Sequence, residues 1–266
     1  KLLLGNKQHQ SKATFSLSGG DLYTQFIFGG NYRHESTVLP SNTADNAVQF
    51  HLSAQHRSHD NRFGITTSVS YNVDNNSLPN YSLNVSNYNL PPNYPLYNPD
   101  GSLYFGTSFS NPLAGLNSIY SLKSNNLISN ISLHYTVLPG LDLKVNAGYN
   151  YDNVFSSTIT PASASNPLYN YTPTSTLGNN YIKTYIVEPQ INYTHVWGKS
   201  RLKALLGGTW QETQYVQPYY LLGSFNNIQL ANSLAALTVL IKTSGYTDYK
   251  YDSGFARLEY EWDGKY

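Results

Sequence analysis

The chain has 266 residues, a mass of 29.7 kDa and a formal net charge of +1, and only 12% of its residues are charged. This balance gives no electrostatic footprint for nucleic acid, and the absence of cysteine excludes disulfides and thiolate metal sites. The longest mostly apolar run, residues 234–241, is well short of the roughly 20 residues of a membrane-spanning helix. Any membrane role must therefore be carried by strands.

The first part of the chain predicts four strands in which apolar and polar residues alternate. These strands cover residues 11–18, 22–33, 48–55 and 63–74. A period of two indicates β-structure, because successive side chains leave a strand on opposite sides. In the fourth strand, Phe63, Ile65, Val69 and Tyr71 share one face, and Thr66, Ser68, Asn72 and Asp74 share the other. Each strand therefore has an apolar and a polar face.

The rest of the chain predicts five more strands between turns and long polar loops. The strands cover residues 129–137, 141–152, 181–197, 201–212 and 253–262. Long loops are expected over about 75–125, 153–180 and 213–249, the first with a small turn at Asn98-Pro99-Asp100-Gly101. Pro189 lies inside a predicted strand, which indicates a bulge or an unpaired position.

Short turns and long loops alternate strictly along this series of strands. The short turns centre on Gly20, His59, Pro139, Gly198 and Gly264. This asymmetry is typical of transmembrane β-barrels, whereas a soluble β-sandwich has no reason to place every long loop at one end. Single-chain bacterial barrels use even strand numbers, and lipid does not tolerate open sheet edges. We therefore expect an all-β, antiparallel segment of about nine strands from a larger transmembrane barrel.

Aromatic residues on the apolar face mark the ends of a membrane-sized band. Phe63 and Tyr71 are eight residues apart, which corresponds to about 19 Å along the membrane normal for a tilted strand. Aromatics near the short turns are Tyr135, Tyr193, Trp197, Tyr260 and Trp262, and those near the opposite rim are Tyr32, Tyr149, Tyr151 and Trp210. Two aromatic girdles around an aliphatic middle favour lipid exposure. The alternative is the core of a soluble β-sheet protein.

Several stretches of the chain resemble the SusC/RagA-like TonB-linked outer-membrane transporters. LSGGDLYTQFIFGGNY (17–32) resembles a strand-turn-strand of that family with its Ser-Gly-Gly turn. LPPNYPLYNPDGSLYF (90–105), followed by NPLAGL (111–116), is similar to the family's large outer loop. LPGLDLKVNAGYNY, LKALLGGTWQ and SGFARLEYEWDGKY resemble successive barrel hairpins, so the resemblance extends through the whole chain.

The resemblance implies the architecture and the partners of a nutrient importer. It implies a barrel of about 22 strands occluded by an N-terminal plug, so that residues 1–266 would be a partial barrel domain without the plug and the closing strands. It also implies import driven by the TonB complex, a surface lipoprotein of the SusD type as a lid, and oligosaccharides or peptides as cargo. The implied location is the outer membrane of a Gram-negative bacterium of the Bacteroidetes type.

Candidate binding residues lie in the expected loops and on the polar strand faces. Aromatic rings stack on sugars or peptide side chains, which makes the loop residues Tyr94, Tyr97, Tyr104, Phe105, Tyr169, Tyr171, Tyr219 and Tyr220 candidates for cargo binding. They could equally pack the loops together or contact the lid. The residues expected to face the barrel lumen are Arg33, Gln49, His51, Gln55 and Lys144.

No pattern in the sequence indicates catalysis. His56, His59 and Asp60 could supply metal ligands, but a solvated polar turn is the better interpretation of so short a stretch, and no metal or cofactor is expected. No nucleotide-binding or nucleophile motif occurs. The sequence therefore predicts a TonB-dependent importer and not an enzyme. The alternatives are a passive porin-like channel and a secreted β-sandwich binding module.

Overall fold

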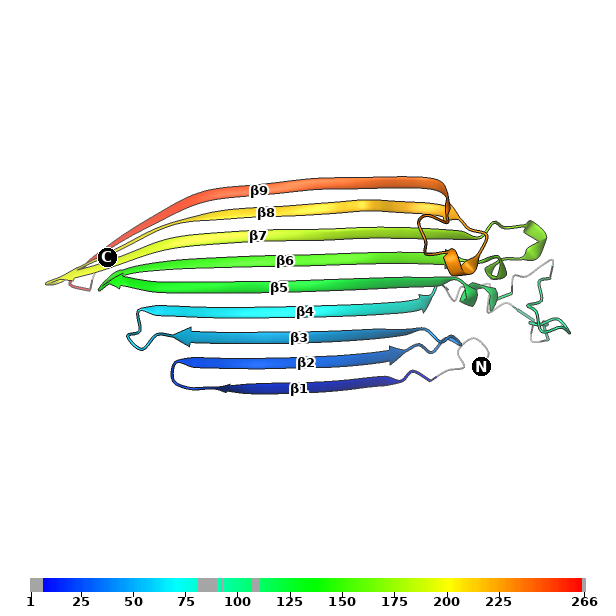
Figure 1. Ribbon diagram of the computed structural model, residues 1–266, viewed down its shortest axis with the longest axis horizontal. Helices are drawn as coiled ribbons and strands as arrows, with labels where there is room; N and C mark the ends of the chain where they lie inside the picture. Colours follow the sequence, from blue (N-terminus) through cyan, green and yellow to red (C-terminus); the bar gives the residue numbers. More distant parts are fainter. Residues whose placement is uncertain (1–6, 81–89, 92, 107–110, 265–266) are drawn as a thin grey trace.

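The computed structural model describes residues 7–80, 90–91, 93–106 and 111–264, which form one nine-stranded antiparallel sheet (Figure 1). Each strand pairs with its neighbours in sequence, in the order β1 to β9. The strands are β1 (Gln10–Gly20), β2 (Thr24–Ser36), β3 (Ala44–Arg57), β4 (Phe63–Pro79), β5 (Ile119–Leu138), β6 (Leu141–Thr160), β7 (Thr174–Trp197), β8 (Ser200–Ser224) and β9 (Thr238–Trp262). The predicted antiparallel arrangement of nine strands is confirmed.

The two ends of the sheet differ as the sequence predicts. Short turns join β1 to β2, β3 to β4, β5 to β6 and β7 to β8 at one end, here called the turn end. The longer connections gather at the other, the loop end (Figure 1). They carry the short 3-10 helices η1 (Ala114–Asn117), η2 (Ala162–Ala164), η3 (Pro167–Tyr169) and η4 (Ile228–Leu230). Among the described residues, no helix is long and apolar enough to cross a membrane.

Strand register aligns the two kinds of face across the whole sheet. Directly paired residues share a face, so the pairs Ile65 with Leu133, Leu133 with Val145 and Val145 with Pro189 continue one apolar row over four strands. The next row contains Thr66, Ser132, Asn146 and Glu188 and is polar. We call these two sides of the sheet the apolar face and the polar face.

The apolar face is apolar over only part of each long strand. Toward the loop end it passes a tyrosine or tryptophan, such as Tyr71 in β4 and Trp210 in β8, and then becomes polar or charged. Residues of this outer zone are Lys123, Asn125, Asn153, Lys183, Glu212, Gln214, Asp248 and Lys250. The apolar stretch is about nine residues long in β4 to β8, close to the 9–11 residues of a tilted transmembrane strand. The strands therefore continue well beyond a membrane-sized band.

This continuation corrects three sequence predictions. Residues 75–79 with 119–125, 153–160 with 174–180, and 213–224 with 238–249 were expected in loops, but they belong to β4 and β5, to β6 and β7, and to β8 and β9. Both faces are polar in much of the outer zone, so the apolar alternation that indicates a strand is absent there. Cross-strand hydrogen bonding continues all the same, because the neighbouring strands are equally long.

The largest buried cluster lies at the loop end, where the β8–β9 connection covers the apolar face. Phe225, Ala231 and Leu237 of this connection pack with Leu177 of β7 and Leu221 of β8, and Leu177 is 0% exposed. Phe155, Ile159 and Tyr219 pack against the cluster. The apolar segment 234–241, which was expected to lie in a loop, is therefore split between two environments. Leu237 belongs to this cluster, and the residues from Thr238 onward belong to β9.

Glycine and proline act at defined positions of the meander. Gly140, in the β5–β6 turn, has φ +86°, and a Cβ there would lie 2.2 Å from the carbonyl oxygen of Thr194. Pro189 is paired with Val145 in the β6–β7 register, but the β7–β8 pairing is interrupted between Val187 and Gln190. The predicted unpaired position at Pro189 is confirmed on its β8 side. A register shift between β7 and β8 lies closer to the loop end, between Asn179 and Tyr181 of β7.

Candidate functional site

The structure places all five residues expected to face a lumen on the polar face. Gln49, His51 and Gln55 follow one another along β3, Arg33 lies on β2, and Lys144 lies on β6. Each β3 residue contacts a neighbouring polar side chain. Gln49 Oε1 accepts from Asn31 Nδ2 at 3.0 Å, His51 Nδ1 lies 2.8 Å from Ser70 Oγ, and Gln55 Nε2 donates to Gln25 Oε1 at 2.7 Å. These contacts link polar side chains of β2, β3 and β4 across the polar face.

Near the loop end, Arg33 is surrounded by carboxylates from three strands. Its guanidinium lies 3.1 Å from Glu35, 2.6 Å from Asp45 and 3.7 Å from Asp74. Three carboxylates against one guanidinium leave this group formally negative. Asp45 and Asp74 were missed as functional candidates, because only the register that pairs Arg33 with Ala47 and Ala47 with Asp74 brings them together.

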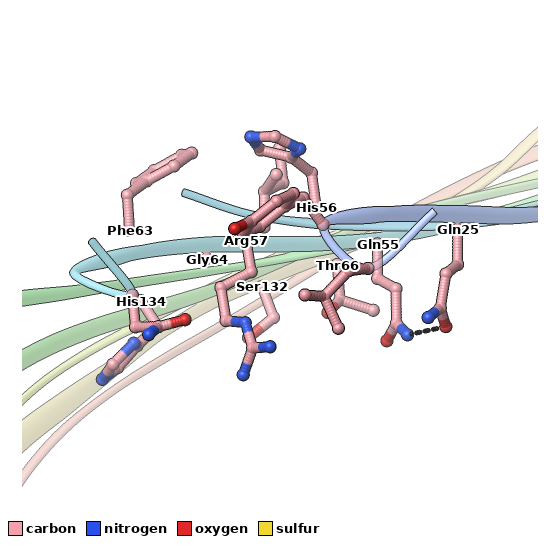
Figure 2. A pocket seen from close by; sticks show the side chains of 13 residues that line it. Gln25, Gln55, His56, Arg57, Phe63, Gly64, Thr66, Ser132 and His134 are labelled. Atoms are coloured by element: carbon pink, nitrogen blue, oxygen red, sulfur yellow. Dashed lines mark hydrogen bonds between the residues drawn. The ribbon is translucent and has the colours of Figure 1, made fainter. Parts of the chain in front are cut away.

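At the turn end, a hollow of about 480 Å³ lies over β2 to β5. Its lining comprises Gln25, Gln55, Arg57, Thr66, Ser132 and His134 on the polar face, and it continues to His56, Phe63 and Ile65 on the apolar face. Figure 2 shows Arg57, His134, Gln25 and Gln55 on one side of the sheet, and His56 and Phe63 on the other. His134 Nε2 lies 3.2 Å from Asp142 Oδ1. Arg57 and His134 were not among the predicted lumen residues, although the position of His134 between Leu133 and Tyr135 was a usable signal.

At the loop end, a second hollow of about 610 Å³ lies between the β4–β5 and β6–β7 connections. Leu103, Tyr104 and Phe105 line it from the first connection, and Pro167 and Leu168 from the second. Asn117 Nδ2 donates to the carbonyl oxygen of Ser163 at 3.0 Å and so ties the two connections together. The other residues that line the second hollow are small or uncharged, namely Asn98, Gly101, Ser102, Ser163, Ser165 and Asn166. The site suits an uncharged ligand surface with apolar and hydrogen-bonding parts.

The structure brings some of the predicted loop aromatics together. The rings of Tyr94 and Tyr104 pack edge to face, with centroids 5.6 Å apart, and Tyr97 forms a β-bridge with Leu103. The nearly buried Asn111 supports this loop by donating to the carbonyl oxygens of Leu96 at 2.7 Å and Tyr104 at 2.9 Å. Tyr104 and Phe105 border the second hollow, as noted above.

The remaining predicted aromatics lie apart from this hollow's lining. Tyr169 and Tyr171 pack against each other at 6.1 Å and remain 68% and 60% exposed. Tyr219 and Tyr220 were expected in a loop, and that expectation is wrong, because β8 extends to Ser224. Tyr219 packs against the buried cluster under the β8–β9 connection, whereas Tyr220 points to the other face and pairs with Thr243. Cargo binding by these four residues stays a prediction.

The histidines and aspartates of the short turns have local partners. His56 Nδ1 lies 2.7 Å from Thr24 Oγ1, and the His59 ring stacks on Tyr23 with centroids 4.0 Å apart. The hydroxyl of Ser58 and the backbone N–H of Arg62 donate to Asp60 and lower the pKa of its carboxyl group. In the described part of the chain, no group of three or more His, Asp or Glu side chains is arranged to hold a metal ion.

Comparison with known proteins finds likeness in fold but not in sequence. No protein-family profile matches the chain, and no curated protein matches it in sequence. Solved structures that match it in fold include the RagAB peptide importer in the closed-closed state, the RagAB peptide transporter, and the importer in the open-open state. TM-scores are 0.69, 0.70 and 0.67, with 19%, 19% and 18% identity.

The chain has the fold of a segment of these RagAB chains. The match covers 96% of this chain and 30% of each matched chain. At this identity the likeness concerns the fold, and it confirms at that level the resemblance to SusC/RagA-like transporters. All three matched structures are described as importers or transporters and none as an enzyme.

Proposed function

We propose that this chain is part of the barrel of a TonB-dependent outer-membrane importer of nutrients. The observation that carries the proposal is the match to the RagAB importer at TM-scores of 0.67–0.70 over 96% of the chain. Because the chain spans only 30% of those chains, the plug and the remaining strands would lie elsewhere in a longer protein. The protein would have no enzymatic activity of its own, and its location would be the outer membrane of a Bacteroidetes-type bacterium.

The apolar face gives physical support to a place in a membrane. Its aliphatic middle, including Ile65, Val69, Leu143 and Val145, lies between aromatic residues at both borders. Aromatic residues favour the lipid–water interface and aliphatic residues the hydrocarbon region. In this account the aliphatic middle contacts lipid, and the polar face lines a water-filled lumen or contacts the plug.

The proposed cargo is a peptide or an oligosaccharide, and the matched structures favour a peptide. RagAB is described as a peptide importer. The second hollow offers aromatic and amide groups at the loop end, where cargo would arrive and where a SusD-type lipoprotein would close the barrel. The loop aromatics at this end would contact cargo, lid or both.

The decisive experiment compares energised import with passive flow. The full-length protein is produced in its host, and uptake of a labelled peptide mixture is measured with and without the TonB complex. Import that stops without TonB supports the proposal. Uptake that continues in proportion to external concentration would instead identify a porin-like channel. Recovery of the full-length protein from the soluble fraction without detergent would favour a secreted binding module over the importer.

A further inference from the structure

Three basic side chains form one row across the polar face at the turn end. Arg57 of β3 pairs with Gly64 of β4, Gly64 pairs with His134 of β5, and His134 pairs with Lys144 of β6. Paired residues share a face, so all three side chains leave the sheet on the same side, as Figure 2 shows for Arg57 and His134. Adjacent strands are about 4.8 Å apart, which sets the backbones of Arg57 and Lys144 about 14 Å apart.

Gly64 leaves the middle of this row open. A Cβ at this position would approach only the carbonyl oxygen of His56, at 3.9 Å. The gap between Arg57 and His134 belongs to the hollow of about 480 Å³. Thr66 borders it with a hydroxyl group that can donate a hydrogen bond, whereas the Ser132 hydroxyl donates to Asn146 Oδ1 at 2.9 Å.

Two of the three basic groups lack an acidic partner within the described residues. Arg33, Arg201, Lys203 and Arg257 each lie within 4.0 Å of a carboxylate, but Arg57 and Lys144 form no such pair in the described part of the sheet. Asp142 is the nearest acidic residue in sequence to Lys144, and its Oδ1 is taken by His134 at 3.2 Å and by the Thr136 hydroxyl at 2.6 Å. An external carboxylate would give this row the acceptor that it lacks.

The charge of the polar face changes sign along β2 to β6. The group of Arg33 with Glu35, Asp45 and Asp74 is formally negative near the loop end. Asp74 and Gly64 are ten residues apart on β4, or about 33 Å along the strand. Lys12 of β1, which pairs with Arg33, offsets one of these negative charges. A carboxylate is therefore less favoured near the loop end than at the row of Arg57 and Lys144.

We propose that Arg57, beside His134 and Lys144, forms a subsite for the terminal carboxylate of a peptide cargo. The inference rests on the proposed import function and adds the chemical group that the lumen recognises and the direction in which the peptide lies. The guanidinium binds the carboxylate with paired N–H donors, and Lys144 contributes a second positive charge. The peptide's carboxyl end then points toward the turn end.

The test uses the purified full-length protein and two peptides that differ only in that carboxylate. One is a neutral pentapeptide with an N-terminal fluorophore and a free carboxyl end, and the other is its C-terminal amide. Fluorescence anisotropy should give about 5–10-fold tighter binding of the acid. Arg57→Gln should remove this difference and leave amide binding unchanged, and Arg57→Lys should retain part of it. Arg62→Gln is the matched control, because Arg62 lies in the β3–β4 turn outside the hollow's lining.

Three results would overturn the inference. They are equal binding of acid and amide, an equal effect of Arg57→Gln and Arg62→Gln, and an equal effect of Arg57→Gln on both peptides. If neither peptide binds the unmodified protein, peptide import itself fails, and a second probe decides the subsite. Hexanoate should then give a saturable isothermal titration that hexanamide does not give and that Arg57→Gln removes. Hexanoate binding that is absent or survives Arg57→Gln would reject the subsite.

Discussion

A charge placed on the apolar face should destabilise the protein according to its depth in the membrane. Val145 of β6 is four residues from Leu141 at the turn end and six from Tyr151. A strand that rises 3.3 Å per residue at a tilt of about 45° advances about 2.3 Å along the membrane normal per residue. Val145 therefore lies about 9 Å from one border and about 14 Å from the other, near the middle of the band. Arginine at this depth costs about 2–4 kcal/mol in a membrane barrel.

The assay is reversible urea unfolding of the full-length protein in lipid vesicles, followed by tryptophan fluorescence. Val145→Arg should lower the free energy of unfolding by about 2–4 kcal/mol, and Tyr151→Arg, at the border, by about 0–1 kcal/mol beyond the loss of its ring. Asn146→Arg is the control, because Asn146 is the next residue on the same strand and lies on the polar face. Equal costs at Val145 and Asn146 would refute the assignment of the two faces.

Three further predictions address the turns and the loop end. Leu177→Ala should lower the local free energy of unfolding by about 2–5 kcal/mol, because Leu177 is 0% exposed in the cluster below the β8–β9 connection. Amide hydrogen exchange should then be faster in residues 225–237 and unchanged in β3. An equal change in exchange throughout the sheet would contradict this prediction. Gly140→Ala should disrupt the β5–β6 turn, since its Cβ would lie 2.2 Å from the Thr194 carbonyl oxygen. Gly101→Ala is the control for backbone strain alone, because Gly101 is also at positive φ but no atom lies within 4 Å of its Cβ. Equal losses of stability in the two variants would argue against the clash with Thr194. The backbone N–H groups of Thr24 and Tyr23 lower the pKa of the Asp21 carboxyl group, so its stabilisation of the β1–β2 turn is fully present above the ordinary value of 3.8 and is lost as pH falls through the lowered pKa. The exchange rate of the Thr24 amide should therefore differ between Asp21→Asn and the parent at pH 6, and the two rates should converge toward pH 2. A difference that stays constant with pH would refute this origin.

The sequence predicted the membrane-sized part of the sheet well. Within this part, one face of each strand is apolar and the other polar, so alternation alone identifies the strand. The predicted strand 63–74 begins where β4 begins, and the two strands around Pro139 form the predicted hairpin. The small turn at Asn98 to Gly101 is also present, with the Gly101 N–H donating to the Asn98 carbonyl oxygen at 3.0 Å.

The outer zone could not be predicted from the same signal. Around Lys123 and Asn125 both faces of β5 carry polar side chains, which is also the composition of a loop. Tyr219 was also assigned to a loop, although it lies in β8. Strand continuation here is decided by pairing with neighbours of equal length, and pairing is a property of several segments together. Alternation in one segment carries no information about it.

The candidate sites were predictable in kind and only partly in composition. Alternation placed Arg33 and Lys144 on the polar face, as the structure has them. It did not bring Asp74 to Arg33, nor place His134 in one row with Arg57, since both arrangements depend on register between strands. The hollow beside Leu168 likewise depends on how two loops meet, which no local pattern encodes.

The central claim, that the apolar face contacts lipid, is tested most directly by quenching from within the bilayer. This chain contains no cysteine, so after replacement of any cysteine elsewhere in the full-length protein, single cysteines at Leu143, Lys144, Val145 and Asn146 can carry a fluorophore. In vesicles of brominated lipid, the labels at 143 and 145 should be quenched, and those at 144 and 146 should respond only to a water-soluble quencher. Labels at 143 and 145 that neither quencher reaches would instead place this face in a dry protein interior and contradict the account.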